Sequence, residues 1–243
     1  MPTNVREFRE RSDARPQNHL LALLPPAVLG RLRPHLQAVN LHRKEVLFRA
    51  HEPLSVSYFP STAVVSLIST LRSGQSLEVG LVGPDGLAGT AVFPRITMMS
   101  CDGIVQIPGI AQRISADVLR RELLADETLY ATVGRFAQVL LVRAMQMSTC
   151  IMFHSVEERC VRWLLTVSDL INDSQIPVTH DVMAAMLGVR RPTVTLVLRS
   201  LHKAGLVNEG RGLIEIHDRR RLEQACCECY GVMREEQRRL VGY

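Results

Sequence analysis

The chain has 243 residues, of which 47% are hydrophobic and 22% are charged, so it is long enough for two compact domains or for one large domain. Its formal net charge of +5 suits a polyanionic partner but is lower than that of most ribosome-coating proteins. No apolar run approaches the length of a membrane-spanning helix, and the charged N-terminus resembles no secretory signal, so we expect a cytoplasmic protein without a membrane segment.

The first half of the chain predicts a tail followed by a domain of short strands. Residues 1–19 carry both signs of charge without apolar periodicity, which predicts a flexible tail. A short helical pattern then starts at Leu20 and stops near Pro34. Turn signals such as Gly83-Pro84-Asp85-Gly86 recur at short intervals from about residue 39 to residue 114. Strand-length apolar segments lie between them at residues 56–59, 63–71, 77–82, 104–107 and 111–114. These features predict an antiparallel barrel or roll, within a domain at residues 20–127.

A long helix is predicted next. Ser115 precedes a short helical pattern at residues 116–124, and a pattern without proline then runs from residue 128 to residue 154. Apolar residues recur in it at steps of three and four, as in a coiled-coil seam, which predicts that this helix joins two copies of the chain. The alternative is that it packs on the chain's own barrel, and a helix that is apolar on two faces can do both. The predicted dimer contact consists of Leu129, Val133, Phe136, Leu140, Ala144, Met147 and Ile151.

Residues 155–243 carry the most specific pattern in the chain. Thr179 is the expected N-cap of a short helix, and Gly188 stands where the chain must turn into the next helix. That second helix starts near Arg191, with Pro192 in its first turn, where proline is tolerated. Its buried stripe is predicted to consist of Val194, Val197, Leu198 and Leu201. A glycine-rich hairpin at residues 206–216 follows, so the order is helix, turn, helix and wing.

The outer face of the second helix has the residue types that read DNA. Arginine can hold guanine bidentately, and threonine can contact a phosphate or a thymine methyl group. The alternative, a solvated amphipathic helix, would have to explain the cap, the turn glycine, the buried stripe, the basic face and the wing together. We therefore predict DNA binding in the major groove. The predicted contact residues are Thr179, Arg190, Arg191, Pro192, Thr193, Thr195, Leu196, Arg199, Lys203 and, at the wing tip, Arg211.

Two motifs resemble the Crp/Fnr family of bacterial regulators. Residues 186–194, Leu201, residues 205–206 and residues 212–216 resemble its helix-turn-helix and wing, and residues 79–89 resemble a turn of its cyclic-nucleotide-binding roll. The resemblance implies an α+β fold, with an N-terminal antiparallel β-roll, a long dimerisation helix and a C-terminal winged helix-turn-helix. In the recognition helix, Pro192 and Leu196 replace the glutamate and second arginine that are commonest in the family. The usual operator therefore cannot be assumed, and Leu196 is predicted to lie against a thymine methyl group.

The signal pocket that the resemblance implies is altered. Cyclic-AMP-binding members hold the ribose with a glutamate and the phosphate with an arginine followed by serine or threonine. By register, Gly89 takes the place of the glutamate and Met99 that of the arginine, while Ser100 remains. A cyclic phosphate without a cation would lose its charge-assisted contacts, so we expect no tight cyclic AMP binding. The predicted effector pocket, for an unknown signal, consists of Gly83, Gly86, Gly89, Met99 and Ser100.

The six cysteines are predicted to be reduced thiols, because the chain has no secretory signal and no regular cysteine spacing. The resemblance implies iron–sulfur binding only with an N-terminal cysteine group, and residues 1–19 contain no cysteine. Cys226, Cys227 and Cys229 follow the wing in a predicted helix, where neighbouring positions point in different directions, so free thiols are favoured over a metal or redox site. Three further cysteines are predicted to be buried filler: Cys101, Cys150 and Cys160. The histidines at 42, 51, 154 and 180 show no metal-ligand spacing, so no metal or cofactor is predicted.

The predicted protein is a homodimeric transcriptional regulator that presents two recognition helices to DNA half-sites about one helical turn apart. Its partners are double-stranded DNA, a second copy of the chain and, if it activates transcription, RNA polymerase. An enzyme is not favoured, because the sequence has no phosphate-binding loop, nucleophile elbow or zinc-hydrolase helix. The remaining alternative is a signalling module that binds protein without reading DNA.

Overall fold

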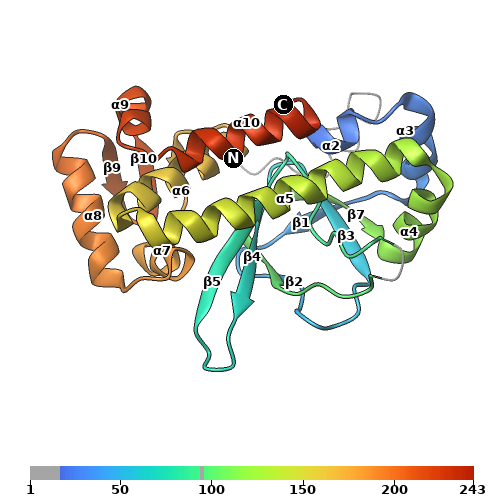
Figure 1. Ribbon diagram of the computed structural model, residues 1–243, viewed down its shortest axis with the longest axis horizontal. Coiled ribbons are helices and arrows are strands. Elements are labelled where there is room, and N and C mark those ends of the chain that lie inside the picture. Colours follow the sequence, from blue (N-terminus) through green and yellow to red (C-terminus); the bar gives the residue numbers. More distant parts are fainter. Residues whose placement is uncertain (1–16, 94–95) are drawn as a thin grey trace.

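The computed structural model describes residues 17–93 and 96–243. Strands β1 to β7 lie in one part of the molecule, helices α7 to α9 lie with strands β9 and β10 at the opposite end, and the long helix α5 (Glu127–Phe153) runs between the two parts (Figure 1). Residues 1–16 of the predicted tail lie outside the described residues. The end of that tail was predicted too late, because Asn18 is 1% exposed and caps helix α2 (His19–Ala22). Its side-chain amide donates to the carbonyls of Pro60 and Gly86, both at 2.8 Å, which fastens the chain to the roll.

The predicted antiparallel roll is confirmed. One sheet has the strand order β1-β7-β3, and the other has the order β2-β6-β4-β5. The strands are β1 (Gln37–Leu41), β2 (Val46–Phe48), β3 (Val56–Pro60), β4 (Val64–Thr70), β5 (Ser76–Val82), β6 (Asp102–Ile107) and β7 (Gly109–Ser115). The five predicted strands match β3 to β7. The first two were not predicted, because β1 has only three aliphatic side chains and β2 only three residues, so neither shows a clear alternation.

Short helices pack against the roll. The helical pattern predicted from Leu20 to Pro34 is divided by the two prolines that start the second of its helices. These elements are α2, α3 (Pro26–Leu32) and the 3₁₀ turn η1 (Arg33–His35), and α4 (Ala116–Ala125) follows the last strand of the roll. Their apolar faces join one core with the roll and with the first half of α5, so the roll and this helix form one packed unit.

Helix α5 presents a different face to the solvent from the one predicted. Leu129, Val133 and Phe136 are at most 1% exposed and lie in the chain's own core, so they offer no surface to a second copy. The prediction that these three residues form a dimer contact is therefore wrong. Their packing on the chain's own roll explains the periodicity. A second seam on α5 faces the solvent, and its exposed or half-buried residues also follow steps of three and four. It consists of Ala131, Gly134, Gln138, Leu141, Met145, Ser148 and Met152.

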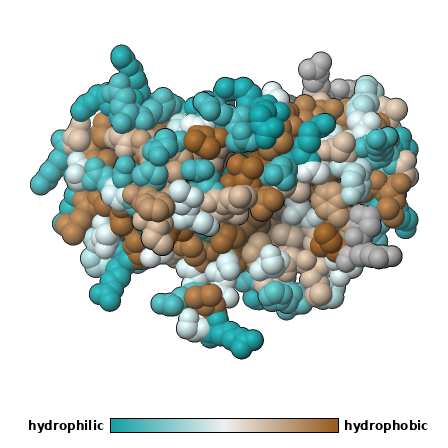
Figure 2. Space-filling view, viewed as in Figure 1, coloured by the Kyte–Doolittle hydropathy of each residue, from teal (hydrophilic) through white to brown (hydrophobic). Residues whose placement is uncertain are grey.

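The exposed part of α5 is unusually apolar. Leu141, Met145 and Met152 expose 52%, 63% and 74% of their surface. Hydrophobic side chains gather along the middle of the face in Figure 2, where α5 crosses the molecule in Figure 1. Among the described residues, α5 is also the one helix that is long and apolar enough to cross a membrane by length and composition. The sequence prediction missed this because arginines interrupt the run, and the finding is weak evidence for a membrane, since such helices also occur in soluble proteins.

The C-terminal part has the predicted order of helix, turn, helix and hairpin. Its elements are α6 (Val156–Ile171), β8 (Gln175–Ile176), α7 (His180–Leu187), α8 (Arg191–Lys203), β9 (Val207–Gly210), β10 (Leu213–Ile216), α9 (Arg219–Gln224) and α10 (Cys229–Val241). The wing is a three-stranded sheet of order β8-β10-β9, in which β8 was not predicted. Trp163, Leu198 and Ile214 are at most 1% exposed in a core that α6 to α9 share. Helix α10 returns along α5, so the end of the chain contacts the N-terminal half (Figure 1).

A buried carboxyl group lies where strand β5 meets helix α6. Glu78 is 1% exposed, and it accepts hydrogen bonds from the Ser66 hydroxyl at 2.6 Å and from the Trp163 indole at 2.9 Å. Burial raises its pKa from 4.5 to about 7, although the two donors and the charge of Arg162 act in the opposite direction. The junction between the roll and the C-terminal part is therefore sensitive to the ionisation of one side chain.

Glu78→Gln is expected to make stability less dependent on pH. Because the pKa of Glu78 is raised on folding, the folded state keeps a proton that the unfolded state has lost between pH 4.5 and about 7. The contribution of Glu78 to the free energy of unfolding must then fall as pH rises through this window, and glutamine removes that dependence. Urea unfolding of both proteins at pH 5 and pH 8 measures it. An equal pH dependence in the two proteins would contradict the expectation.

Candidate nucleic-acid interface

The turn between α7 and α8 is built by local backbone chemistry. The Thr179 hydroxyl accepts from the Val182 N–H at 3.3 Å, as expected for the N-cap of α7. Gly188 ends that helix in the left-handed region, at φ 64° and ψ 36°, which a residue with a Cβ rarely adopts. Helix α8 then begins at Arg191 with Pro192 in its first turn, as predicted.

The two faces of α8 are clearly different. Val194, Leu198 and Leu201 are at most 1% exposed, and they fix the helix against the core below it. The residues at 191, 192, 196, 199 and 203 face the solvent, and those at 193 and 195 are half-buried. Leu196 exposes 66% of its surface, so its side chain is accessible to a partner. The structure thus places the predicted outer face of the recognition helix where DNA can reach it.

Two residues of this face already have partners within the chain. The Arg191 Nε lies 3.4 Å from the Asp181 carboxylate, and both side chains are about two-thirds exposed. DNA must compete with this exposed ion pair, which water already weakens. The Thr195 hydroxyl lies 3.0 Å from His180 Nδ1 and 3.2 Å from the Arg191 carbonyl, to which it can donate. Thr195 therefore connects α7 with α8, in addition to facing the candidate interface.

His180 also connects the helices with the wing. Its Nε2 lies 3.1 Å from a carboxylate oxygen of Glu209 in β9. Reading the sequence missed both Asp181 and Glu209, because neither lies on the recognition helix and only the fold brings them to it. The two acidic groups restrict how the basic face can approach phosphate, since a carboxylate repels it.

The wing tip lies beside the helix-turn-helix. Strands β9 and β10 are joined by Arg211 and Gly212, and Gly212 has φ 71°, which the tight turn requires. Arg211 is exposed at the tip, whereas Arg190 is exposed just before α8. The Thr179 methyl group lies 3.7 Å from where a Gly212 Cβ would be. The N-cap of α7, the start of α8 and the wing tip therefore lie near one another.

Two of the predicted effector residues pack against helices. Gly86 packs so closely on α5 that an added Cβ would lie 1.9 Å from the Phe136 ring, and a Cβ on Gly83 would lie 3.0 Å from Leu170 of α6. Gly89 is buried with φ 86°, Met99 is half-buried and Ser100 is exposed. The approach at 1.9 Å explains why glycine is needed at 86, whereas the contact at 83 is tight but could be relieved by a small movement of Leu170. Both glycines serve helix packing, whatever the roll binds.

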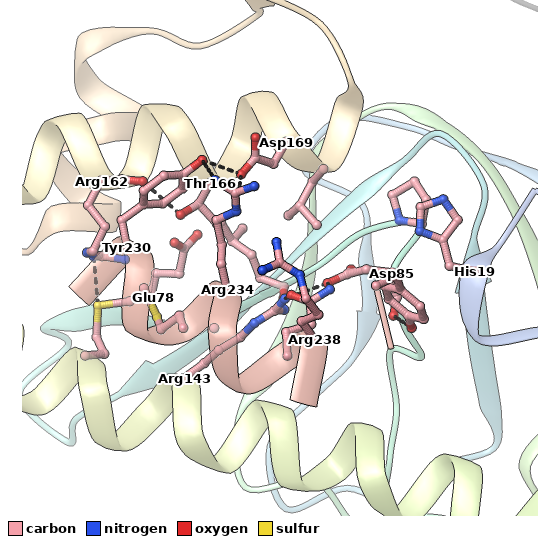
Figure 3. A pocket seen from close by; sticks show the side chains of 18 residues that line it. His19, Glu78, Asp85, Arg143, Arg162, Thr166, Asp169, Tyr230, Arg234 and Arg238 are labelled. Atoms are coloured by element: carbon pink, nitrogen blue, oxygen red, sulfur yellow. Dashed lines mark hydrogen bonds and ion pairs between the residues drawn. The ribbon is translucent and has the colours of Figure 1, made fainter. Parts of the chain in front are cut away.

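A cavity of about 250 Å³ lies outside the roll, between β5, α5, α6 and α10 (Figure 3). Its charged lining includes the four arginines Arg143, Arg162, Arg234 and Arg238, with Glu78, Asp85 and Asp169. The sequence did not predict this cavity, because its walls come from segments far apart in the chain, such as His19 and Tyr243, which are separated by 224 residues.

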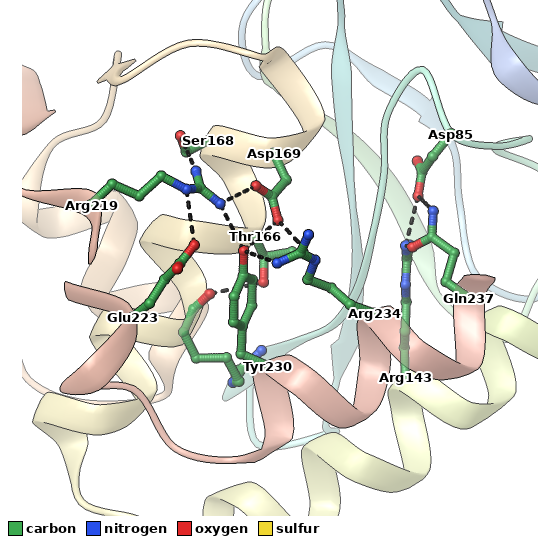
Figure 4. Close-up of polar contacts among 11 residues, drawn as sticks. Asp85, Arg143, Thr166, Ser168, Asp169, Arg219, Glu223, Tyr230, Arg234 and Gln237 are labelled. Atoms are coloured by element: carbon green, nitrogen blue, oxygen red, sulfur yellow. Dashed lines mark hydrogen bonds and ion pairs between the residues drawn. The ribbon is translucent and has the colours of Figure 1, made fainter. Parts of the chain in front are cut away.

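Two polar networks hold α10 beside this cavity (Figure 4). In the first, Arg143 donates to the Asp85 carboxylate at 2.6 Å and to the Leu81 carbonyl at 3.0 Å, and Gln237 of α10 also contacts Arg143. The Arg143 and Asp85 side chains are only 10% and 5% exposed. The Gly83-Pro84-Asp85-Gly86 turn is thereby joined to α5 and α10 by a buried ion pair.

The second network joins α6, α9 and α10. The Tyr230 hydroxyl donates to the Asp169 carboxylate at 2.7 Å, and Arg219 contacts the same carboxylate at 2.5 Å. Arg234 lies over the Tyr230 ring, 5.2 Å from its centre. Burial and the neighbouring Asp169 raise the pKa of Tyr230, so its hydroxyl keeps the proton that it donates. These contacts fix α10 on the reading head, by which we mean the helix-turn-helix and wing formed by α6 to α9 and β8 to β10.

The comparisons with known proteins agree with this geometry. Residues 158–225 match the model of the Crp-like helix-turn-helix domain. No curated protein sequence matches the chain. Among solved structures, FixK2 from Bradyrhizobium japonicum is 16% identical with a TM-score of 0.68, covering 79% of this chain and 98% of its own.

Two further structures have the same arrangement. The c-di-GMP responsive global regulator CLP from Xanthomonas campestris is 19% identical with a TM-score of 0.65, over 80% of this chain and 100% of its own. A putative transcriptional regulator of the Crp/Fnr family from Eubacterium rectale is 16% identical with a TM-score of 0.65, over 83% of this chain and 94% of its own. The chain therefore has the fold of the Crp/Fnr transcriptional regulators and carries a Crp-like helix-turn-helix domain.

Proposed function

We propose that this chain is a sequence-specific DNA-binding transcriptional regulator that acts in the cytoplasm and has no enzymatic activity of its own. The observation that carries the proposal is the outer face of α8, where exposed Arg191, Arg199 and Lys203 surround the exposed Leu196. Arg190 before the helix and Arg211 on the wing are exposed, and the wing tip lies beside Thr179 at the start of the helix-turn-helix, so both add positive charge near α8. This combination suits base contacts from the helix and phosphate contacts from its flanks.

A mobility shift of fragmented genomic DNA tests the proposal against its rival, a module that binds protein alone. A DNA-binding regulator retards some fragments selectively, and retardation weakens as salt rises because bound counterions are released. A protein-binding module shifts no fragment selectively at any salt concentration, which would overturn the proposal.

The regulator is proposed to be a homodimer joined through the exposed seam of α5. Leu141, Met145 and Met152 lie on one face of the helix, because the steps between them are four and seven residues. A second copy that packs its own seam on this one would cover the apolar surface and present two recognition helices to a palindromic operator. RNA polymerase joins these partners if the protein activates transcription.

Replacing Leu141 and Met145 together by aspartate is expected to give a monomer. The two aspartates of one copy would face the two aspartates of the other across the seam, and their charges would repel. The apolar contacts of Leu141 and Met145 would also be lost. Sedimentation velocity measures the mass, and aspartate at Leu71, exposed by 62% at the start of the β4–β5 turn, is the control. A double variant that remains dimeric would show that another surface joins the copies.

Leu196→Arg is expected to change the preferred base at one position of each half-site. An outward leucine suits a thymine methyl group, whereas arginine in its place can hold guanine bidentately. Selection of operators from random DNA with each protein measures the preference. An unchanged base at every position would show that Leu196 does not read DNA.

The signal is proposed to act on the N-terminal roll and to be something other than cyclic AMP, since Gly89 and Met99 supply neither the ribose acceptor nor the phosphate cation. The roll and the reading head could adopt more than one relative position. A signal that binds one of these positions better than another would change the fraction of protein that can bind DNA. Calorimetric titration with cyclic AMP is expected to show no binding, and a micromolar or tighter dissociation constant would overturn this part of the proposal.

A further inference from the structure

Four potential metal ligands meet where α5 ends and α10 begins. Cys150 and His154 come from the last turn of α5 and its C-cap, and Cys227 and Cys229 come from the start of α10. One ligand atom from each of the four residues lies within 4.8 Å of every other. Cys150, Cys227 and Cys229 are at most 4% exposed. The sequence prediction treated these residues separately, as buried filler, an isolated histidine and free thiols.

Two of the distances between these atoms match the spacing around one tetrahedral ion, and the remaining ones do not exceed 4.8 Å. The sulfurs of Cys150 and Cys227 lie 3.7 Å apart, and Cys229 Sγ lies 3.5 Å from His154 Nδ1. Around a tetrahedral zinc ion, bonds of about 2.3 Å to sulfur and about 2.0 Å to nitrogen place ligand atoms about 3.5–3.8 Å apart. A cluster of several irons needs ligands spread more widely around it, so the compact set favours a single ion.

The surrounding groups are those that orient metal ligands. While Nδ1 of His154 faces the sulfurs, its Nε2 lies 3.2 Å from the Glu228 carboxylate, an arrangement that fixes the ring and makes its other nitrogen a better donor to metal. The Gln146 side-chain amide donates to Cys229 Sγ at 3.1 Å, which suits a thiolate. A packing cluster of neutral thiols would need neither contact.

The charge around the site also suits three thiolates. Zinc with three thiolates and a neutral imidazole has a net charge of −1, which needs a cation nearby in a buried position. Arg159 and Arg162 of α6 are 8% and 3% exposed, and both interact electrostatically with Cys150. Two buried guanidinium groups therefore lie close enough to Cys150 to offset part of this negative charge.

We propose that Cys150, His154, Cys227 and Cys229 bind one zinc ion, with release of the three thiol protons to the solvent. The site would join the start of α10 to the end of α5, next to Ser155, the N-cap of α6. If the proposed function holds, zinc would thereby fix the angle between the α5 helix and the reading head. Binding of the ion itself does not depend on that function, and its test does not use DNA.

The test is the zinc content of the full chain, purified under reducing conditions without a metal-binding tag, supplied with zinc and then desalted. The expected result is one zinc ion per chain by elemental analysis. Cobalt in place of zinc is expected to give the visible absorption of a tetrahedral ion with thiolate ligands. A chain that retains no zinc, a chain that holds iron with acid-labile sulfide, or a Cys150–Cys227 disulfide without metal would each overturn the proposal.

Matched variants assign the ligands. Cys227→Ser with Cys229→Ser is expected to lower the zinc content from one equivalent to near zero, and so is His154→Ala with Cys150→Ser. Cys226→Ser is the control, because Cys226 is adjacent in sequence yet outside the four-residue set, and it is expected to retain one equivalent. Retention of zinc by either double variant would overturn the assignment, and the cobalt spectrum of the unmodified chain decides the matter if a variant does not fold.

Discussion

Arg143→Met is expected to destabilise the protein by about 3–5 kcal/mol, because it leaves the buried Asp85 carboxylate without its cation. The Asp85 side chain is only 5% exposed and would keep the Gly83 N–H, at 2.9 Å, as its main donor. Methionine retains most of the length of arginine, so it leaves little empty space. The loss of stability therefore measures the ion pair and its hydrogen bonds rather than the cost of a cavity. The free energy of unfolding in urea measures it.

The control for this prediction is Arg31→Met. Arg31 contacts Asp126 at 2.5 Å and Glu122 at 3.3 Å, but its side chain is 45% exposed, so water replaces the lost contacts. We expect a much smaller change than at Arg143. Equal losses in the two variants would show that the Asp85–Arg143 pair does not join the roll to α5 and α10 in the way proposed.

Arg199→Ala is expected to weaken operator binding strongly and to relax the base preference at one position of each half-site. A bidentate contact between arginine and guanine contributes about 1–3 kcal/mol of discrimination, and a dimer makes the contact twice. Fluorescence anisotropy with a selected operator measures the dissociation constant at fixed salt.

Arg121→Ala is the matched control for Arg199→Ala. It removes the same charge from an exposed position in the N-terminal domain, so it separates a base contact from a change in net charge. We expect the control to bind nearly as tightly as the unmodified chain. Equal weakening by both variants would contradict a specific role for Arg199.

The C-terminal part was largely predictable because its determinants are local. Thr179, Gly188 and Pro192 set the cap, the turn and the helix start within a short stretch, and the buried stripe of α8 follows from helical spacing. The roles of Asp181 and Glu209 were not predictable, since they depend on how neighbouring elements pack around the recognition helix.

The α5 helix shows why periodicity alone does not identify a partner. Its seam through Val133 and its seam through Leu141 both repeat at steps of three and four, and only the packing of the roll decides which one is covered. Likewise, Cys150 and Cys229 are 79 residues apart in the sequence, and they meet because α10 returns along α5. The four-residue spacing of Cys150 and His154, the C-cap of α5, and the two-residue spacing of Cys227 and Cys229 were the local signals of that site.

Sequencing of the genomic fragments bound by the full chain, compared with those bound by an Arg191→Ala, Arg199→Ala double variant, tests the central claim most directly. We predict that the unmodified protein enriches an imperfect palindrome with half-sites about one helical turn apart, and that the double variant loses this enrichment. Fragments without a shared sequence, or the same enrichment by both proteins, would contradict the claim that α8 reads DNA.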